Sequence, residues 1–172
     1  MISRAKNVIG AAILVSGALA GAAWAQVSEN RVAANTDWSV FVEGTQCWGV
    51  SAPKETVNTR DGKPAQVRRG DILLFITYEK GAKGQISFTG GYPFAPDSTV
   101  ALDVSGTKFD LFVDGEWAWA AEGEDEKIIG ALKSGSSAVL TAHSAKGTQT
   151  QDTFSLSGFS AALDEATKRC AG

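Results

Sequence analysis

The two cysteines of the chain, Cys47 and Cys170, have the widest choice of chemistry. A thiolate can attack a substrate, ligate a metal or form a disulfide. Nucleophilic catalysis needs a base close to the thiol, and the chain has one histidine, His143. A structural zinc site takes four ligands at paired spacings, which two distant cysteines and one histidine do not provide. The compartment of the protein therefore decides what the cysteines do.

The N-terminus is typical of a secretory signal peptide. Arg4 and Lys6 precede an apolar run over residues 8–22, and Ala23-Trp24-Ala25 has the small-residue pattern of a cleavage site. We therefore expect a signal peptide over residues 1–25. The run is short and rich in glycine and alanine, whereas an uncleaved anchor needs roughly 18 strongly apolar residues. We expect no transmembrane segment after cleavage, and a periplasmic or secreted protein in which Cys47 and Cys170 form a disulfide.

The composition of the mature chain is that of one ordinary globular domain. Of the 16 basic and 19 acidic residues, two basic residues lie in the leader, which leaves a mature net charge of −5. Nucleic-acid binding calls for a basic surface, so we expect no nucleic-acid partner.

Residue types that could catalyse a reaction do not fall into a known pattern. The nucleophile elbow, the P-loop, the dinucleotide fingerprint and the zinc-protease motif do not occur in the sequence. His143 is expected at an exposed strand end, although a triad assembled in space stays possible. The acids Glu122, Glu124, Asp125 and Glu126 suit the start of a helix better than a cation loop. We predict no enzyme, no metal and no cofactor.

Basic and aromatic residues form one candidate binding surface. Four cations lie around a single loop and strand start, where they could bind an anionic ligand or a partner, or could be ordinary surface charge. Two aromatic residues follow in the Gly/Pro-rich stretch 90–96, where they could form a recognition surface or fold back as a plug on the end of the domain. The residues concerned are Arg60, Lys63, Arg68, Arg69, Tyr92 and Phe94.

Trp117 and Trp119 are the second candidate site. Because side chains alternate along a strand, both indoles lie on one face. They could line a pocket for a small ligand, or pack in the core against the helix that follows.

Period-two hydrophobicity and Gly-containing turns predict an all-β domain. Residues 26–36 lack a pattern and are expected to be flexible, and residues 52–64 are expected to be a polar loop. The domain over residues 37–170 is predicted to be an antiparallel β-sandwich of about eight strands with two short peripheral helices, 122–134 and 157–170. Cys170 falls on the apolar stripe of the second helix with Leu163 and Ala166, which carries the thiol inward. Strands are expected over residues 38–43, 46–51, 67–78, 85–89, 100–104, 109–113, 117–119, 138–143 and 148–156.

Over these elements the chain resembles the invasion-associated locus B family of bacterial secreted proteins. Asp37-Trp38-Ser39-Val40, Gln46-Cys47 and the C-terminal stretch 154–170 carry the resemblance. It implies a periplasmic or surface-released, mostly-β domain with no known catalytic activity, linked in pathogenic members to entry into host cells. Phe41 stands where some members carry a cysteine, so their additional disulfide is not expected.

These observations lead us to expect an exported, non-enzymatic envelope or secreted protein with an unknown protein or surface partner. The alternatives are a periplasmic small-ligand-binding protein with a pocket at Trp117 and Trp119, and a small hydrolase that uses His143.

Overall fold

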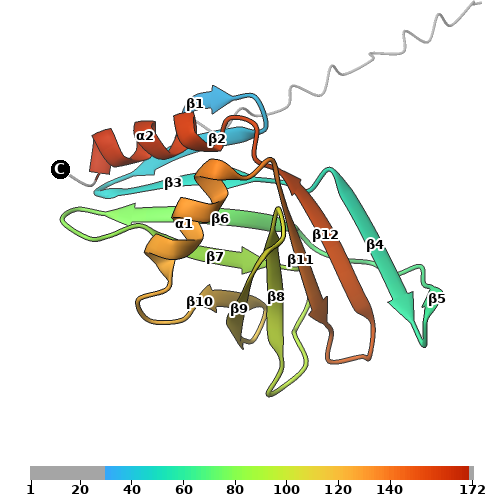
Figure 1. The fold of residues 1–172 in the computed structure, drawn as a ribbon. Coiled ribbons are helices and arrows are strands. Elements are labelled where there is room, and N and C mark those ends of the chain that lie inside the picture. Colours follow the sequence, from blue (N-terminus) through green and yellow to red (C-terminus); the bar gives the residue numbers. More distant parts are fainter. Residues whose placement is uncertain (1–29, 171–172) are drawn as a thin grey trace, which may run out of the picture.

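The computed structural model describes residues 30–170, which form one antiparallel sheet of twelve strands and two α-helices (Figure 1). The order of the strands in the sheet is β1-β2-β3-β6-β7-β10-β9-β8-β11-β12-β4-β5. The elements in chain order are β1 (Arg31–Asn35), β2 (Trp38–Glu43), β3 (Gln46–Ser51), β4 (Glu55–Arg60), β5 (Lys63–Pro64), β6 (Leu73–Glu79), β7 (Gln85–Thr89), β8 (Thr99–Val104), β9 (Thr107–Asp114), β10 (Trp117–Ala120), α1 (Asp125–Ser134), β11 (Ser137–His143), β12 (Gln149–Ser155) and α2 (Phe159–Cys170).

The sheet curls until its two halves meet. Ser51 ends β3 and Glu55 begins β4, so three residues carry the chain from one half of the sheet to the other. Three hydrogen bonds hold the start of β2 and the β3–β4 link against β12. The Trp38 indole donates to the Ser155 carbonyl at 3.0 Å, the Asp37 amide to Ser157 at 3.2 Å and the Lys54 amide to Thr153 at 2.7 Å. The result encloses one core instead of leaving a flat sheet.

The all-β class with two helices is confirmed, and the number of strands is higher than predicted. The meander β8-β9-β10 lies where the alternating pattern and the glycine turns placed it. The expected sandwich of about eight strands is instead one continuous sheet of twelve strands. The difference lies in three polar strands, β1, β4 and β5.

These three strands form without an apolar alternation of their own. Arg31–Asn35, expected to be flexible, pairs with β2, and Glu55–Arg60, expected to be a loop, pairs with β12 over five residue pairs. The short strand β5 then pairs with β4 at the edge of the sheet. Their order comes from the backbone hydrogen bonds that a neighbouring strand offers, which a hydrophobic pattern does not record.

Both helices lie on the same side of the left half of the sheet in Figure 1. The helix α2 packs on β1, β2, β3 and β6, and α1 packs on β7. Buried side chains of α2 meet the buried face of β2, where Phe159 lies edge-on to Trp38 at 4.9 Å. Gly158, just before α2, has a φ of +91°, and a Cβ there would lie 1.9 Å from the Asn35 carbonyl oxygen. Glycine is therefore needed where α2 begins over β1.

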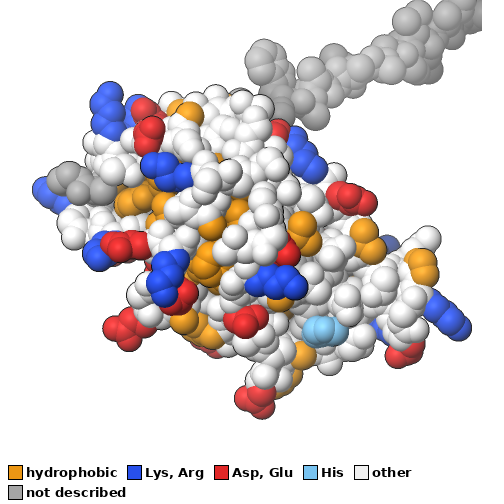
Figure 2. Space-filling model, viewed as in Figure 1, with side chains coloured by type: hydrophobic (Ala, Val, Ile, Leu, Met, Phe, Trp, Pro, Cys, Tyr) orange, Lys and Arg blue, Asp and Glu red, His pale blue; other side chains and the backbone are white. Residues whose placement is uncertain are grey.

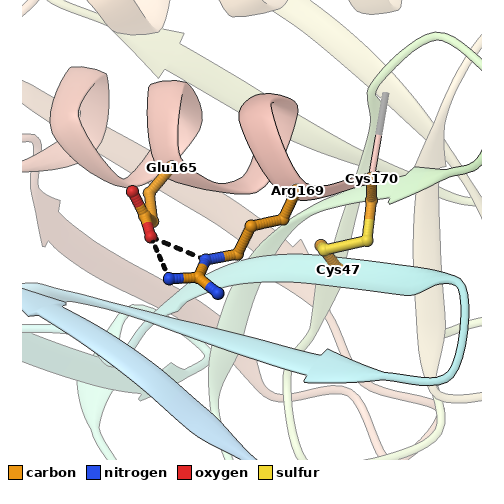
Figure 3. The surroundings of a disulfide bond; sticks show 4 residues. All are labelled: Cys47, Glu165, Arg169 and Cys170. Carbon is orange, nitrogen blue, oxygen red and sulfur yellow. Dashed lines mark hydrogen bonds and ion pairs between the residues drawn. A yellow bond between two sulfur atoms is a disulfide. The ribbon is translucent and has the colours of Figure 1, made fainter. Parts of the chain in front are cut away.

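The predicted disulfide is formed between Cys47 of β3 and Cys170 at the end of α2, with a Cα–Cα distance of 5.8 Å (Figure 3). Cys47 is fully buried and Cys170 is nearly so. An ion pair between Glu165 and Arg169 lies beside the bond on the same helix. The disulfide thus joins the last helix to the first hairpin of the domain.

Candidate functional site

A cavity of about 140 Å³ opens where the segment before β6, the β7–β8 loop and the β11–β12 turn meet. We call it the basic pocket. The side chains that give it its character are Arg60, Arg68, Arg69, Lys146, Tyr92 and Thr148. It contains three of the four predicted cations and one of the two predicted aromatic residues, and its lining includes no carboxylate.

The floor of the basic pocket is a buried ion pair. The side chain of Arg69 is 6 % exposed and that of Asp152 is fully buried. The Arg69 guanidinium donates to both carboxylate oxygens of Asp152, at 2.8 Å and 2.6 Å. Its Nε donates to the Gly90 carbonyl at 2.8 Å. Such a two-pronged, fully hydrogen-bonded geometry is what makes a buried ion pair tolerable.

Two glycines bring Arg69 beside Tyr92. The Gly70 amide donates to the Gly91 carbonyl at 2.8 Å. Gly91 has a φ of +73°, and a Cβ there would lie 2.6 Å from the Gly70 carbonyl oxygen. Because the two backbones touch, the residues next to them are neighbours. The Arg69 guanidinium lies 5.0 Å from the centre of the Tyr92 ring, within the range of a cation–π contact.

Tyr92 closes one side of the pocket with its phenol turned inward. Its hydroxyl lies 2.5 Å from the Thr150 hydroxyl. Burial raises the pKa of Tyr92, and this effect outweighs the hydrogen bond with Thr150 and the positive charge of Arg69, which lower it. Tyr92 therefore keeps its proton at neutral pH.

The rim of the basic pocket carries three exposed cations from three segments, Arg60, Arg68 and Lys146. Arg60 donates to the Thr148 hydroxyl at 2.7 Å. Within residues 30–170, none of the three has a carboxylate within 4.0 Å, whereas Arg69 is neutralised by Asp152. The rim thus carries positive charge that no near acid offsets.

Two residues of the predicted surface lie elsewhere. Lys63 is exposed on β5 and does not line the pocket. Phe94 is 5 % exposed and packs on Phe88 and Tyr92, with ring centres 6.0 Å and 5.2 Å apart. The expectation that Phe94 belongs to an exposed surface is wrong, because its backbone bridges to Ser144 and turns the ring into the core. Phe94 is a plug, the alternative that the sequence left open.

A second candidate region lies on the face of the sheet that the helices leave uncovered. Register places Phe75, Ser87, Trp119 and Phe112 opposite one another on β6, β7, β10 and β9. Phe41 and Trp48 are paired in the same way on β2 and β3. We call these side chains the aromatic face; its members are Phe41, Trp48, Phe75, Phe112, Trp117 and Trp119.

Members of the aromatic face are partly exposed, and three of them lie ring against ring. Phe112 is 51 % exposed and Trp117 is 38 % exposed. Ring centres are 5.7 Å apart for Trp117 and Trp119, and 5.6 Å apart for Trp117 and Phe75. A shallow groove of about 250 Å³ runs among these rings and is otherwise lined by amide and hydroxyl side chains, with no charged residue.

Trp117 and Trp119 therefore lie neither in the core nor in a closed pocket. Their small neighbour Ala118 occupies the buried phase of β10 instead. The expected core packing on the following helix is wrong for both indoles. A signal for one further member was present in the sequence, because Phe112 falls out of phase with the apolar residues Phe109, Leu111 and Val113 of its strand.

Sequence reasoning did not identify Lys146, Thr148 and Thr150 as lining residues of the basic pocket, nor Asp152 as the partner of Arg69 beneath it. Asp152 shares the inward phase of β12 with Thr150 and Phe154. A carboxylate at an inward position needs a buried partner, so the pattern did hold the signal. Nothing in the sequence separates Lys146 from other surface lysines.

The remaining candidates stay apart from both regions. His143 is exposed at the end of β11, and Figure 2 shows its imidazole at the surface of the helix-bearing side. On the same side, acidic and basic side chains are interspersed. Asp125 begins α1 and accepts a hydrogen bond from the Ile86 amide at 2.7 Å, while burial raises the pKa of Asp125.

Two negative findings apply to residues 30–170. No group of three or more histidine, cysteine, aspartate or glutamate side chains there could hold a metal ion. In the same range no helix is both long and apolar enough to cross a bilayer. The predicted signal peptide, residues 1–25, lies outside the described residues.

Comparisons with known proteins match part of the chain to a family model and identify a shared fold. The family model described as "Invasion associated locus B (IalB) protein" matches residues 99–167. A search of curated proteins gives no match. The crystal structure of invasion associated protein B from Bartonella henselae is similar with a TM-score of 0.55, over 79 % of this chain and 95 % of that chain, at 15 % sequence identity. The resemblance read from the sequence is confirmed: residues 99–167 match the model of the invasion associated locus B family, and the chain shares the fold of the Bartonella henselae protein.

Proposed function

We propose that the protein is an exported, non-enzymatic interaction protein that binds a protein partner outside the cytoplasm through its aromatic face. The observation that carries this proposal is the group of six aromatic side chains on the uncovered side of the sheet, two of them more than one third exposed. Soluble monomers rarely leave such contiguous aromatic surface in water, and protein interfaces are enriched in aromatic residues.

Three further observations support export and the absence of catalysis. The leader-like N-terminus and the Cys47–Cys170 disulfide both suit an oxidising compartment. Members of the family are typically exported, and the family is not a known enzyme family. The relative from Bartonella henselae bears the name of an invasion-associated protein, so a contact with a host surface is one form that the interaction can take.

The test is site-specific photo-crosslinking in cells that export the protein. A photoreactive residue replaces Phe112 in the aromatic face, and in a matched control it replaces Val57, which is 43 % exposed on β4. We expect a discrete adduct from position 112 in the periplasmic or released fraction, and none from position 57. Trp117→Ala should reduce the yield of the adduct at least fivefold. Because the Trp117 side chain is part-exposed, this substitution should lower the free energy of unfolding by only about 1–2 kcal/mol.

Equal adducts from positions 112 and 57, or an adduct at 112 that Trp117→Ala leaves unchanged, would contradict the proposal.

A second candidate, a small neutral ring-containing ligand in the groove among Trp48, Phe75 and Trp117, is favoured by the uncharged amide and hydroxyl lining. It predicts that the dialysable part of an envelope extract, and not the retained part, changes the tryptophan fluorescence of the wild type but not of Trp117→Ala.

A further inference from the structure

We propose that the basic pocket binds a phosphate-type oxyanion, as a site separate from the aromatic face. The proposal concerns the cavity of about 140 Å³ between Arg68, Arg60 and Lys146. It goes beyond the proposed function because it names a second ligand and a different part of the molecule.

The charge of the pocket points to an anion. Its lining carries four cations and no carboxylate, and only Arg69 is neutralised within residues 30–170, by Asp152 beneath it. Three unpaired cations therefore face one small cavity in a protein whose overall charge is negative. A concave site lined by one sign of charge concentrates counter-ions of the opposite sign.

The pocket is also built to hold its shape. Arg69 and Asp152 are buried and bound to each other by two hydrogen bonds, and Arg69 is held further by the Gly90 carbonyl and the Tyr92 ring. The Tyr92 hydroxyl is held by Thr150. A floor whose side chains cannot rearrange presents the rim cations in a fixed frame, which lowers the entropy lost when a ligand binds.

Hydrogen-bond donors converge with the charges. Arg60 is oriented by its bond to the Thr148 hydroxyl, at 2.7 Å, which leaves its other guanidinium N–H groups free to donate. Arg68 makes no side-chain hydrogen bond and no ion pair within the described part of the chain. Arginine donors in a fork and a lysine ammonium are the usual protein partners of phosphate oxygens.

The size of the cavity limits the ligand. Its volume of about 140 Å³ is well above the roughly 10–15 Å³ that a single water molecule needs. The cavity admits one tetrahedral oxyanion, and because it opens to solvent a larger molecule would place its phosphate in the pocket and its remainder outside. The same chemistry fits a free phosphate, a small phosphate ester or the phosphate of a lipid headgroup.

The experiment compares three proteins on two kinds of probe. The proteins are the wild type, the pocket variant Arg60→Ala/Arg68→Ala/Lys146→Ala, and a control with the same loss of charge, Lys80→Ala/Lys108→Ala/Lys133→Ala, whose three lysines are exposed and line no part of the pocket. One probe is inorganic phosphate, measured by calorimetry. The other is a vesicle of phosphatidylglycerol and phosphatidylcholine, with pure phosphatidylcholine vesicles as the reference.

We expect saturable binding to at least one probe, weakened at least tenfold in the pocket variant and less than twofold in the control. Binding to inorganic phosphate identifies a soluble ligand, and pocket-dependent binding to the anionic vesicles alone identifies a headgroup. Arg68→Ala, which removes no described contact, should by itself weaken binding at least threefold if the triple variant does not fold. No binding to either probe, or equal losses in the pocket variant and the control, would overturn the proposal.

Discussion

The basic pocket contains inward-facing residues of the curled sheet, whereas the aromatic face is made of outward-facing residues. In the pocket, inward residues of β12 meet Arg69 and Tyr92, and the polar side chains of the floor are bonded to one another. On the aromatic face, Trp117 and Trp119 of β10 lie ring against ring, and Phe112 of β9 is half exposed. The residues of the pocket floor therefore stabilise the folded domain, whereas the aromatic face could be altered without unfolding the domain.

The two regions therefore differ in what a substitution does to the stability of the domain. A buried charge is tolerated only while its partner is present, so the floor of the basic pocket cannot change one residue at a time. An exposed aromatic residue loses little when it is truncated, but it leaves apolar surface in water while it is present. The stability of the fold therefore explains the presence of Arg69 and Asp152, but it does not explain the presence of the aromatic face.

The largest effect should come from removing the disulfide beneath the aromatic face. In β3, Cys47 faces α2 and Trp48 faces outward. The bond closes a loop of 123 residues, for which the chain-entropy model gives about 4–5 kcal/mol. We expect Cys47→Ala/Cys170→Ala to lower the free energy of unfolding by nearly that amount in urea, with little change in the native fluorescence of Trp48. A loss below about 1 kcal/mol would show that α2 is held by packing alone.

A smaller but sharper effect is expected from breaking the buried ion pair. Asp152→Ala leaves the Arg69 guanidinium buried without its carboxylate, which should cost about 3 kcal/mol of unfolding free energy. The matched control is Asp114→Ala at the exposed end of β9, which should cost less than about 0.5 kcal/mol. The double variant Arg69→Met/Asp152→Leu should recover most of the loss. Equal stabilities for Asp152→Ala and the control would remove the contrast between the two regions.

The smallest of the three effects is a pH dependence in the pocket. Burial raises the pKa of Tyr92 in the folded protein, so the folded state holds the phenol proton more tightly than the unfolded state, where the value is near 10. The resulting stability is fully present below pH 10 and is lost as the pH rises through the folded pKa. Urea unfolding at pH 8.5, 10 and 11 should show a steeper loss for the wild type than for Tyr92→Phe. Parallel curves would mean that Tyr92 is as free to ionise as an exposed tyrosine.

The alternating pattern predicted much of the fold, because burial of one strand face is a local property. The meander over residues 100–119, both helices and the inward thiol of Cys170 followed from periodicity and turn chemistry. The strands β1, β4 and β5 did not, because their order depends on a neighbour far along the chain; β4 pairs with a strand about ninety residues later. The curl of the sheet depends on the same long-range pairings.

The candidate sites were predictable in part for a related reason. Charge and aromaticity identified Arg60, Arg68, Arg69 and Tyr92 before the structure showed that they meet in one cavity. The same reasoning assigned Trp117 and Trp119 to the core or a pocket, since a sequence shows which residues share a face but not which face a helix covers. Lys146 enters the basic pocket only because the β11–β12 turn reaches it.

The position of α2 has a consequence for the order in which the domain can fold. The inner face of the first hairpin, with Trp38, Val40 and Cys47, is covered by the last helix in the chain. Contacts of such long sequence separation form late and slow folding. During synthesis, which begins at the N-terminus, this apolar face therefore stays uncovered until residue 170 has emerged. The uncovered hairpin is therefore the part of the folding chain that a chaperone would have to keep from pairing with another chain.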